Sequence, residues 1–488
     1  MSPILISSII AAYFFFLIIV GYFTSKGADN DSFFIGNKNS PWYLVAFGMV
    51  GTSLSGVTFI SVPGWVGDSQ FSYMQMVFGY ILGYLVISYV LMPLYYRLQL
   101  TSIYTYLEQR FGFWSYKTGA FYFLLSRTVG SAFRLFLVAN VLQLAIFNSW
   151  GIPYGLTVAI TILLIWVYTQ KGGIKTIVWT DSLQTLFMLT AVGITIWQIS
   201  LKLDWSFVEV VSQIKESEYS KTFFFDDWRS GKYFWKQFFS GAFITIVMTG
   251  LDQDMMQKNL SCKNLKEAQW NMMSFSTVLV FVNLLFLSLG VLLFYYAHKM
   301  GIAIPINGDD LYPMLAIGEL GPFIAVLFIL GLIAAAYSSA DSALTALTTS
   351  VCIDFLDIFK KEKKEQIKTR KRVHILVSLA LYLTIMLFTL IADESVISSL
   401  FKAADYTYGP LLGLYAFGMM TKMQIKDKWV PLVCIICPIA TFLLQHYSAT
   451  LFNGYEFGFE IIILNGLLTF LGLLMLKTSP TNPNTQMN

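Results

Sequence analysis

Four polar side chains stand inside a long apolar stretch of the sequence, residues 322–351. They are Ser338, Ser339, Asp341 and Ser342. The hydrocarbon core of a membrane has no water to satisfy hydroxyls and a carboxylate, so such groups usually face a cavity or a partner. On a helix the three serines share one face, and Asp341 lies beside it. Oxygen ligands without sulfur or imidazole suit a hard cation, which predicts an alkali-ion site buried in a membrane.

Two apolar segments contain residues that interrupt helices. GMVGTSLSGVTFISVPGW (48–65) crowds glycine, serine and Pro63 into one span, and SGAFITIVMTGLDQDMMQ (240–257) has a glycine-flanked, threonine-containing middle. Proline lacks an amide hydrogen, and an interrupted helix exposes carbonyls that are tolerated only beside a cavity. Broken helices at equivalent places in two halves indicate an inverted-repeat transporter with a binding site near the midplane. The alternative is helix packing through small residues.

Buried charges form a further group of candidate residues. Arg127 and Arg134 lie two helical turns apart in one apolar segment, so they share a face. Arg134 is too deep to reach water by extending its side chain, and a buried guanidinium offers a fork of donors to a carboxylate. The alternative is a structural ion pair with an acid such as Asp181. Lys402 and Asp405 lie three residues apart, and the simplest expectation is that they pair with each other.

The composition is that of a membrane protein. The 488 residues are 56% hydrophobic and 12% charged, whereas soluble proteins carry roughly 25% charged residues. The three histidines are far apart, so we expect no zinc site, and nothing indicates nucleic-acid binding. Because a spanning helix needs about 20 apolar residues, the sequence predicts an all-α polytopic membrane protein with about thirteen transmembrane helices. The candidates are residues 3–23, 42–66, 72–95, 117–147, 153–168, 175–201, 236–256, 271–298, 320–350, 373–392, 397–421, 429–446 and 458–476.

The basic residues follow the odd-numbered segments. The largest group is the loop KKEKKEQIKTRKR (360–372), after the ninth segment. Cytoplasmic loops carry excess lysine and arginine, which predicts a plasma-membrane protein with its N-terminus outside and its C-terminus in the cytoplasm. The first segment lacks a basic leader and exceeds the apolar length of a signal peptide, so we expect a retained transmembrane helix. The polar tail 477–488 is expected to be disordered and cytoplasmic.

Four motifs resemble those of the sodium/solute symporter family, which has a LeuT-type fold, and the resemblance covers nearly the whole chain. They are GGIKTIVWTDSLQ (172–184), TGLDQDMMQKNLSCKNLKEAQ (249–269), AAAYSSADSALTALTTSVCIDF (334–355) and YGPLLGLYAFGM (408–419). The family typically has an extra N-terminal helix before a core of ten. The resemblance therefore implies an extra helix and loop in 1–40, a core of two inverted five-helix repeats in 41–421, and two further helices in 422–476.

The resemblance implies that a sodium ion binds between the first and eighth core helices. The matching positions, called here the first ion set, are the carbonyls of Gly51, Leu54 and Ala335 and the hydroxyls of Ser338 and Ser339. Position 51 is an alanine in a known member, and a carbonyl ligand survives its replacement by glycine.

Family members that transport sialic acid have a second sodium site. The matching positions, the second ion set, are Asp181, Ser338, Asp341 and Ser342. Position 341 is a serine in those members, so this chain adds a carboxylate. The addition leaves open how many sodium ions bind, and whether Asp341 holds an ion or a proton.

The same members imply the residues that hold the solute. The matching positions, the solute set, are Ser53, Ser55, Thr58 and Arg134, of which the arginine contacts the substrate carboxylate. The sugar-transporting branch has glutamine at position 58, where this chain has threonine. The proline branch has aspartate at position 53, where this chain has serine. The site is therefore most similar to those for anionic solutes.

The favoured function is sodium-coupled symport of a small organic solute, preferably a sugar acid such as sialic acid or another carboxylate, by alternating access. A neutral sugar or polyol remains an alternative, and a channel or a transporter-like sensor is less favoured. No nucleophile, base and orienting group converge in the sequence, so we do not expect an enzyme. The expected partners are the solute, sodium and the lipid bilayer, with no obligate protein partner evident.

Overall fold

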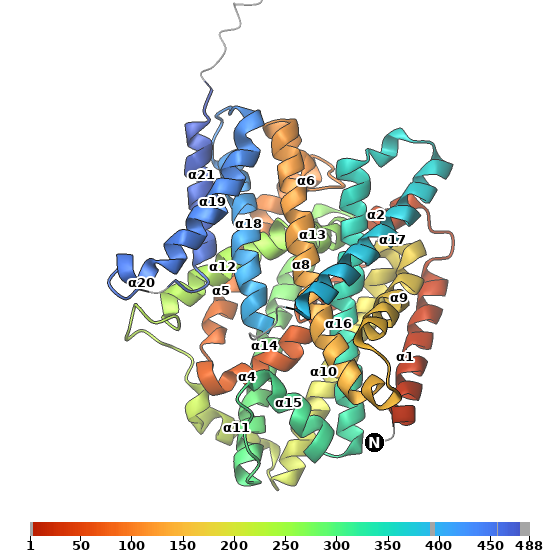
Figure 1. Cartoon of the computed structure of the whole chain (residues 1–488), viewed down its shortest axis with the longest axis vertical. Helices are drawn as coiled ribbons and strands as arrows, with labels where there is room; N and C mark the ends of the chain where they lie inside the picture. Colours follow the sequence, from red (N-terminus) through yellow and green to blue (C-terminus); the bar gives the residue numbers. More distant parts are fainter. Residues whose placement is uncertain (1–2, 391–395, 456, 479–488) are drawn as a thin grey trace, which may run out of the picture.

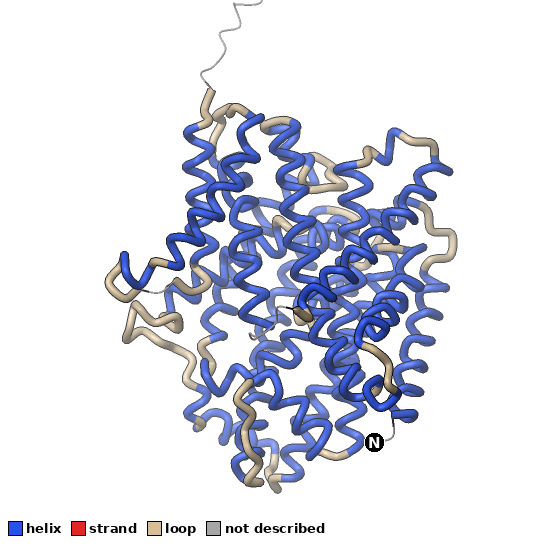
Figure 2. The backbone as a smooth tube through the Cα atoms, in the orientation of Figure 1, coloured by secondary structure: helices blue, strands red, loops and turns tan. Residues whose placement is uncertain are grey.

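The computed structural model describes residues 3–390, 396–455 and 457–478, and the regular structure in these ranges is helical (Figure 2). The helices are α1 (Pro3–Thr24), α2 (Asn30–Ile35), α3 (Trp42–Ser53), α4 (Gly56–Ser69), α5 (Tyr73–Val86), α6 (Met92–Arg97), α7 (Thr105–Arg110), α8 (Phe113–Ala145), α9 (Tyr154–Gly172), α10 (Ile174–Lys202), α11 (Phe207–Glu216), α12 (Phe234–Thr245), α13 (Gln253–Leu260), α14 (Leu265–Lys299), α15 (Leu311–Met314), α16 (Pro322–Ser350), α17 (Lys363–Phe388), α18 (Val396–Met420), α19 (Val430–His446), α20 (Ser448–Leu451) and α21 (Ile461–Met475). The predicted all-α class is confirmed.

Each predicted span coincides with a helix or a pair of helices. Among the described residues, nine helices are long and apolar enough to cross a membrane, or ten if the bent pair α3 and α4 forms one span. Helices α12 and α13 are separated by a break, and α21 has only 15 residues. The count of thirteen therefore stays a prediction.

Helix α16 lies at the centre of the molecule (Figure 1). In the most apolar part of its span, 78% of the residues are buried, whereas the corresponding share is 22% in α1, α17 and α19 at the periphery. Helix α10 packs against both α16 and α3. Small residues allow this close approach, because a Cβ atom at Gly48 would come within 2.9 Å of the Cβ of Asp181 in α10. The helix that carries Ser338, Ser339, Asp341 and Ser342 is therefore surrounded by other helices.

Both predicted helix breaks are present. Helix α3 ends at Ser53, and α4 begins at Gly56 after a bend of 59°. Leu54 (φ −90°, ψ 48°) and Ser55 (φ −44°, ψ 175°) leave the helical conformation, so the last carbonyls of α3 lack the amides of a following turn.

The second break separates α12 from α13. Helix α12 continues into a π-helical turn (Ile246–Gly250), and Leu251 and Asp252 then separate this turn from α13. The Asp252 carboxylate accepts hydrogen bonds from the amides of Asp254 (2.9 Å) and Met255 (3.4 Å) and so caps α13.

The start of α1 and the basic run 360–372 lie at opposite ends of the bundle (Figure 1). In Figure 1, α1 begins near the lower edge, where α11 also lies, and α21 ends near the upper edge. The basic run 360–372 lies at the upper edge as well, but residues 363–372 form the first turns of α17 rather than the predicted loop. The predicted disordered tail lies mostly outside the described residues, which end at 478.

Candidate ion and solute sites

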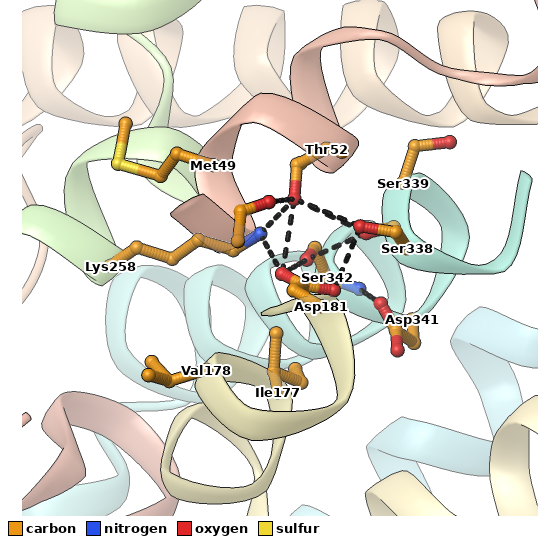
Figure 3. Close-up of polar contacts among 12 residues, drawn as sticks. Met49, Thr52, Ile177, Val178, Asp181, Lys258, Ser338, Ser339, Asp341 and Ser342 are labelled. Atoms are coloured by element: carbon orange, nitrogen blue, oxygen red, sulfur yellow. Dashed lines mark hydrogen bonds and ion pairs between the residues drawn. The ribbon is translucent and has the colours of Figure 1, made fainter. Parts of the chain in front are cut away.

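A cluster of oxygen atoms joins α3, α10 and α16 (Figure 3). Ser338 donates a hydrogen bond to Oδ1 of Asp181 at 2.9 Å, and Ser342 donates to Oδ2 at 3.4 Å. Thr52, at the end of α3, donates to Oδ2 of the same carboxylate at 3.0 Å. All four side chains are buried. Three members of the second ion set, Asp181, Ser338 and Ser342, are therefore in direct contact.

Asp341 faces a different neighbour. Its Oδ2 accepts a hydrogen bond from the hydroxyl of Tyr168 in α9 at 2.9 Å, and its Oδ1 accepts one from the amide of Ser342 at 2.6 Å. Its side chain is fully buried. The fourth member of the second ion set thus lies on the side of the cluster that faces α9.

Two members of the first ion set, Gly51 and Ser338, meet where broken α3 packs against α16. A Cβ atom at Gly51 would lie 3.2 Å from the Ser338 hydroxyl oxygen, which measures how closely the two helices approach. The Ser339 hydroxyl donates to the carbonyl of Ala336 at 3.1 Å, so its lone pairs remain able to bind a cation. Leu54 lies in the break itself, and both Leu54 and Ala335 are buried. Serine hydroxyls and the carbonyls of an interrupted helix are the ligands that a hard monovalent cation requires, so these residues fit sodium.

The sequence analysis missed a lysine in the ion cluster. Lys258 was expected in a basic loop after the seventh span, but it lies in α13 and is 1% exposed. Its ammonium group donates to Oδ2 of Asp181 at 2.5 Å and to the hydroxyl of Thr52 (Figure 3). The predicted end of that span at residue 256 is therefore two residues too early to include it.

The solute set lines a single cavity of about 100 Å³. Ser53, Ser55 and Thr58 contribute from the α3–α4 break, and Arg134 contributes from α8. The other polar side chains in the lining are Thr52, Tyr73, Tyr80, Tyr84, Arg127, Thr245, Thr249 and Asn283. The cavity is therefore rich in hydroxyl groups and contains two guanidinium groups.

Arg134 is buried without an acid of its own. It is 6% exposed, its Nε has no hydrogen-bond partner, and no carboxylate among the described residues forms an ion pair with it. The side-chain oxygen of Asn283, across the cavity lining, also lacks a partner. Buried polar atoms are normally satisfied, so both groups retain hydrogen-bonding capacity that a ligand in the cavity could use.

Arg127 is held by acids that the sequence analysis did not single out. Its guanidinium pairs with the carboxylate of Asp254 and lies 3.9 Å from that of Asp252. Tyr408 of α18 donates a hydrogen bond to Asp252 at 2.5 Å. Asp181, which was considered as an arginine partner, instead pairs with Lys258. The two arginines therefore have different environments although they share a helix.

The expected pairing of Lys402 with Asp405 stays a prediction. The side chain of Lys402 lies outside the described part of the chain. Asp405 is 3% exposed in α18, and one of its carboxylate oxygens has no hydrogen-bond partner within the described residues.

Residues 33–425 match the model of the Sodium:solute symporter family. The chain belongs to this family. The predicted membership, sodium use and transport of a small solute across a membrane are confirmed, and the chain is a multi-pass membrane transporter rather than an enzyme. The family implies a location in the plasma membrane.

Two curated relatives are similar over most of their length. The sodium/sialic acid symporter SiaT of Proteus mirabilis is 25% identical over 469 residues, which cover 92% of this chain and 91% of the relative. The sodium/sialic acid symporter NanT of Aliivibrio fischeri is 25% identical over 466 residues, with coverages of 92% and 88%.

A solved structure of a Na⁺-coupled sialic acid symporter, in a substrate-bound and outward-open state, has a similar fold. It superimposes with a TM-score of 0.81 at 21% identity and covers 96% of this chain and 97% of its own. The symporter's transport fold therefore extends over nearly the whole of this chain.

Proposed function

We propose that this protein imports a sugar acid of the sialic acid type together with sodium. The observation that carries the proposal is Arg134, a buried guanidinium without a carboxylate partner in a cavity lined by hydroxyl groups. A guanidinium binds a carboxylate with two parallel hydrogen bonds. The hydroxyls of Ser53, Ser55 and Thr58 line the same cavity, where they would bind the hydroxyl and amide groups of the sugar.

The relatives support this choice of solute. The two curated symporters described above carry sialic acid and match this chain over about nine-tenths of its length. Each identity is 25%, so the solute is inferred from the cavity and the relatives together. A neutral sugar would leave Arg134 buried and unpaired after binding, which is unfavourable.

We place one sodium ion in the first ion set. The carbonyls of Gly51 and Leu54 at the α3–α4 break, with that of Ala335, would share it with the hydroxyls of Ser338 and Ser339. The same break supplies Ser53 and Ser55 to the cavity. An ion that fixes the break therefore also fixes part of the solute site, which favours solute binding in the sodium-loaded state. Rearrangement of the two halves then exposes the same site to the opposite side.

We orient the N-terminus outside and the C-terminus in the cytoplasm. The basic run 360–372 lies at the end of the bundle where α21 finishes, opposite to the start of α1 (Figure 1). Excess basic residues mark the cytoplasmic side. A membrane potential of about 100 mV contributes about 2.3 kcal/mol per charge, which corresponds to accumulation of roughly 50-fold for one sodium ion per solute.

The test is uptake of N-acetylneuraminate into proteoliposomes that contain the purified protein. We expect uptake above the external concentration with an inward sodium gradient, and only equilibration with a matched potassium gradient. Equal uptake under both gradients would refute sodium coupling. A panel of glucuronate, lactate and mannitol tests the solute class, since preference for mannitol would favour the neutral polyol alternative. Currents on the scale of single channels would favour a channel.

A further inference from the structure

Lys258 is a buried lysine in contact with Asp181 of the second ion set. It lies six residues into α13, is 1% exposed, and extends from this helix toward the contact between α3, α10 and α16 (Figure 3). A lysine so deep in a membrane protein requires compensation for its charge. The only ion pair of Lys258 within the described residues is with Asp181.

The lysine contacts one member of the second ion set directly and reaches two others through shared hydrogen bonds. Its ammonium group binds Oδ2 of Asp181, the oxygen that also accepts the hydrogen bond from Ser342. It binds Thr52 as well, whose hydroxyl lies 3.3 Å from that of Ser338. The ammonium nitrogen therefore binds the carboxylate oxygen of Asp181 that this set would offer to a cation.

The carboxylate of Asp181 is fully engaged in this arrangement. Oδ1 accepts a hydrogen bond from Ser338, and Oδ2 accepts from Thr52, Ser342 and the ammonium group. A sodium ion at the same carboxylate would need these hydroxyls to turn their lone pairs toward it. It would also lie close to the positive charge of Lys258, whose nitrogen is 2.5 Å from Oδ2 of the same carboxylate, in a region that screens charge poorly.

We propose that Lys258 is the resident cation of the second ion set, so that the chain binds one sodium ion, in the first ion set, rather than two. The lysine ammonium supplies the positive charge that would otherwise come from solution, and it connects α13 to α3 and α10. This inference rests on the proposed function, because it assumes sodium in the first ion set. Asp341 does not restore the second site, because its carboxylate is held by Tyr168 and the Ser342 amide.

The experiment counts sodium ions bound to the purified full-length protein. Radioactive sodium is titrated to saturation in a scintillation proximity assay, without solute, on the wild type, on Lys258→Met and on Lys258→Met/Asp181→Asn. Methionine keeps most of the apolar length of the lysine and removes its charge. The double variant also removes the carboxylate charge that the single variant sets free, and it serves as the matched control.

We expect one ion per wild-type chain, two per Lys258→Met chain, and one again in the double variant. The Hill coefficient for sodium in N-acetylneuraminate uptake should rise from about 1 toward 2 in Lys258→Met. Two ions bound to the wild type would overturn the proposal, as would a single ion in well-folded Lys258→Met. If Lys258→Met does not fold, the wild-type count alone decides.

The outcomes separate this proposal from the function on which it rests. A wild-type protein that binds two sodium ions and still shows sodium-driven uptake refutes the role of Lys258 and leaves the proposed function intact. A wild-type protein that binds none refutes both.

Discussion

Replacement of Arg134 by alanine should remove the binding of an acidic solute without unfolding the protein. Truncation of one partner in a buried, hydrogen-bonded charge pair costs about 2–5 kcal/mol. At about 1.4 kcal/mol per factor of ten, the dissociation constant for N-acetylneuraminate should rise roughly 30-fold to several thousand-fold. Because no protein carboxylate pairs with Arg134 among the described residues, the substitution leaves no buried acid without a partner.

The assay is a binding cycle with two solutes and two proteins. The affinities of wild type and Arg134→Ala are measured by calorimetry in saturating sodium, for N-acetylneuraminate and for its neutral methyl ester. The affinity for the acid should fall by the full factor given above, and the affinity for the ester should fall only slightly. Equal losses for both solutes would refute a contact between Arg134 and the carboxylate, and an unchanged affinity for the acid would refute any direct role. Arg134→Lys should be intermediate, since it keeps the charge and loses the planar fork.

Arg127 provides the matched control on the same helix. Its guanidinium pairs with Asp254 and lies near Asp252, and all three side chains are buried. Removal of one partner from a buried ion pair destabilises a protein by about 3–5 kcal/mol. Arg127→Ala should therefore lower the melting temperature and the yield of folded protein, whereas Arg134→Ala should change neither. Similar melting temperatures for the two variants would contradict the assignment of separate roles.

Two further predictions concern the ion site and the packing of the α3 break. Ser339→Ala should raise the sodium concentration for half-maximal uptake by about tenfold, because the loss of one ligand costs on the order of 1.4 kcal/mol. The maximal rate at saturating sodium should change little. An unchanged sodium dependence would remove Ser339 from the first ion set. Gly51→Ala would bring a Cβ within 2.3 Å of the Thr185 hydroxyl oxygen, which accepts a hydrogen bond from the Gly51 amide at 3.0 Å. Overpacking of this kind destabilises a protein by about 1–3 kcal/mol. The melting temperature of Gly51→Ala should therefore be lower than that of the wild type, and that of Gly51→Ala/Thr185→Ala should be partly restored. A double variant that melts at a lower temperature than Gly51→Ala would contradict the clash.

The sequence predicted the architecture well because long apolar segments have few alternatives in a membrane. The first helix break was predicted from glycine, serine and proline in the middle of a span, and the second from a glycine-flanked, threonine-containing middle. The structure has them at Leu54–Ser55 and at Leu251–Asp252. The ends of helices were less predictable. Residues 363–372 are strongly basic but helical, because charged side chains outside the hydrocarbon do not prevent a helix from continuing.

The candidate sites were predicted in part, and the omissions have a common cause. The pattern of residues within one apolar segment identifies polar side chains that stand out from it, and Ser338, Asp181 and Arg134 were identified in this way. Lys258 lies in a short polar helix after a break, with acidic neighbours, and hydropathy alone assigns such a segment to a loop. Its burial depends on α3, α10 and α16 closing around it, which is tertiary information. The departure at Asp341 was visible in the sequence, but its bond to Tyr168 was not.

Helix α13 has only eight residues, Gln253–Leu260, and two buried ion pairs of the described chain, Arg127–Asp254 and Asp181–Lys258, end on it. Asp254, near its start, holds the Arg127 that lines the solute cavity, and Lys258, one turn later, holds the ion cluster. Because one helical turn joins these two residues rigidly, the contact of Asp254 with Arg127 and the contact of Lys258 with Asp181 are expected to shift together. Selection on solute preference and selection on ion preference therefore act on the same few residues. Natural variants that change one of these properties should carry compensating substitutions in this turn, so the two specificities are expected to evolve together.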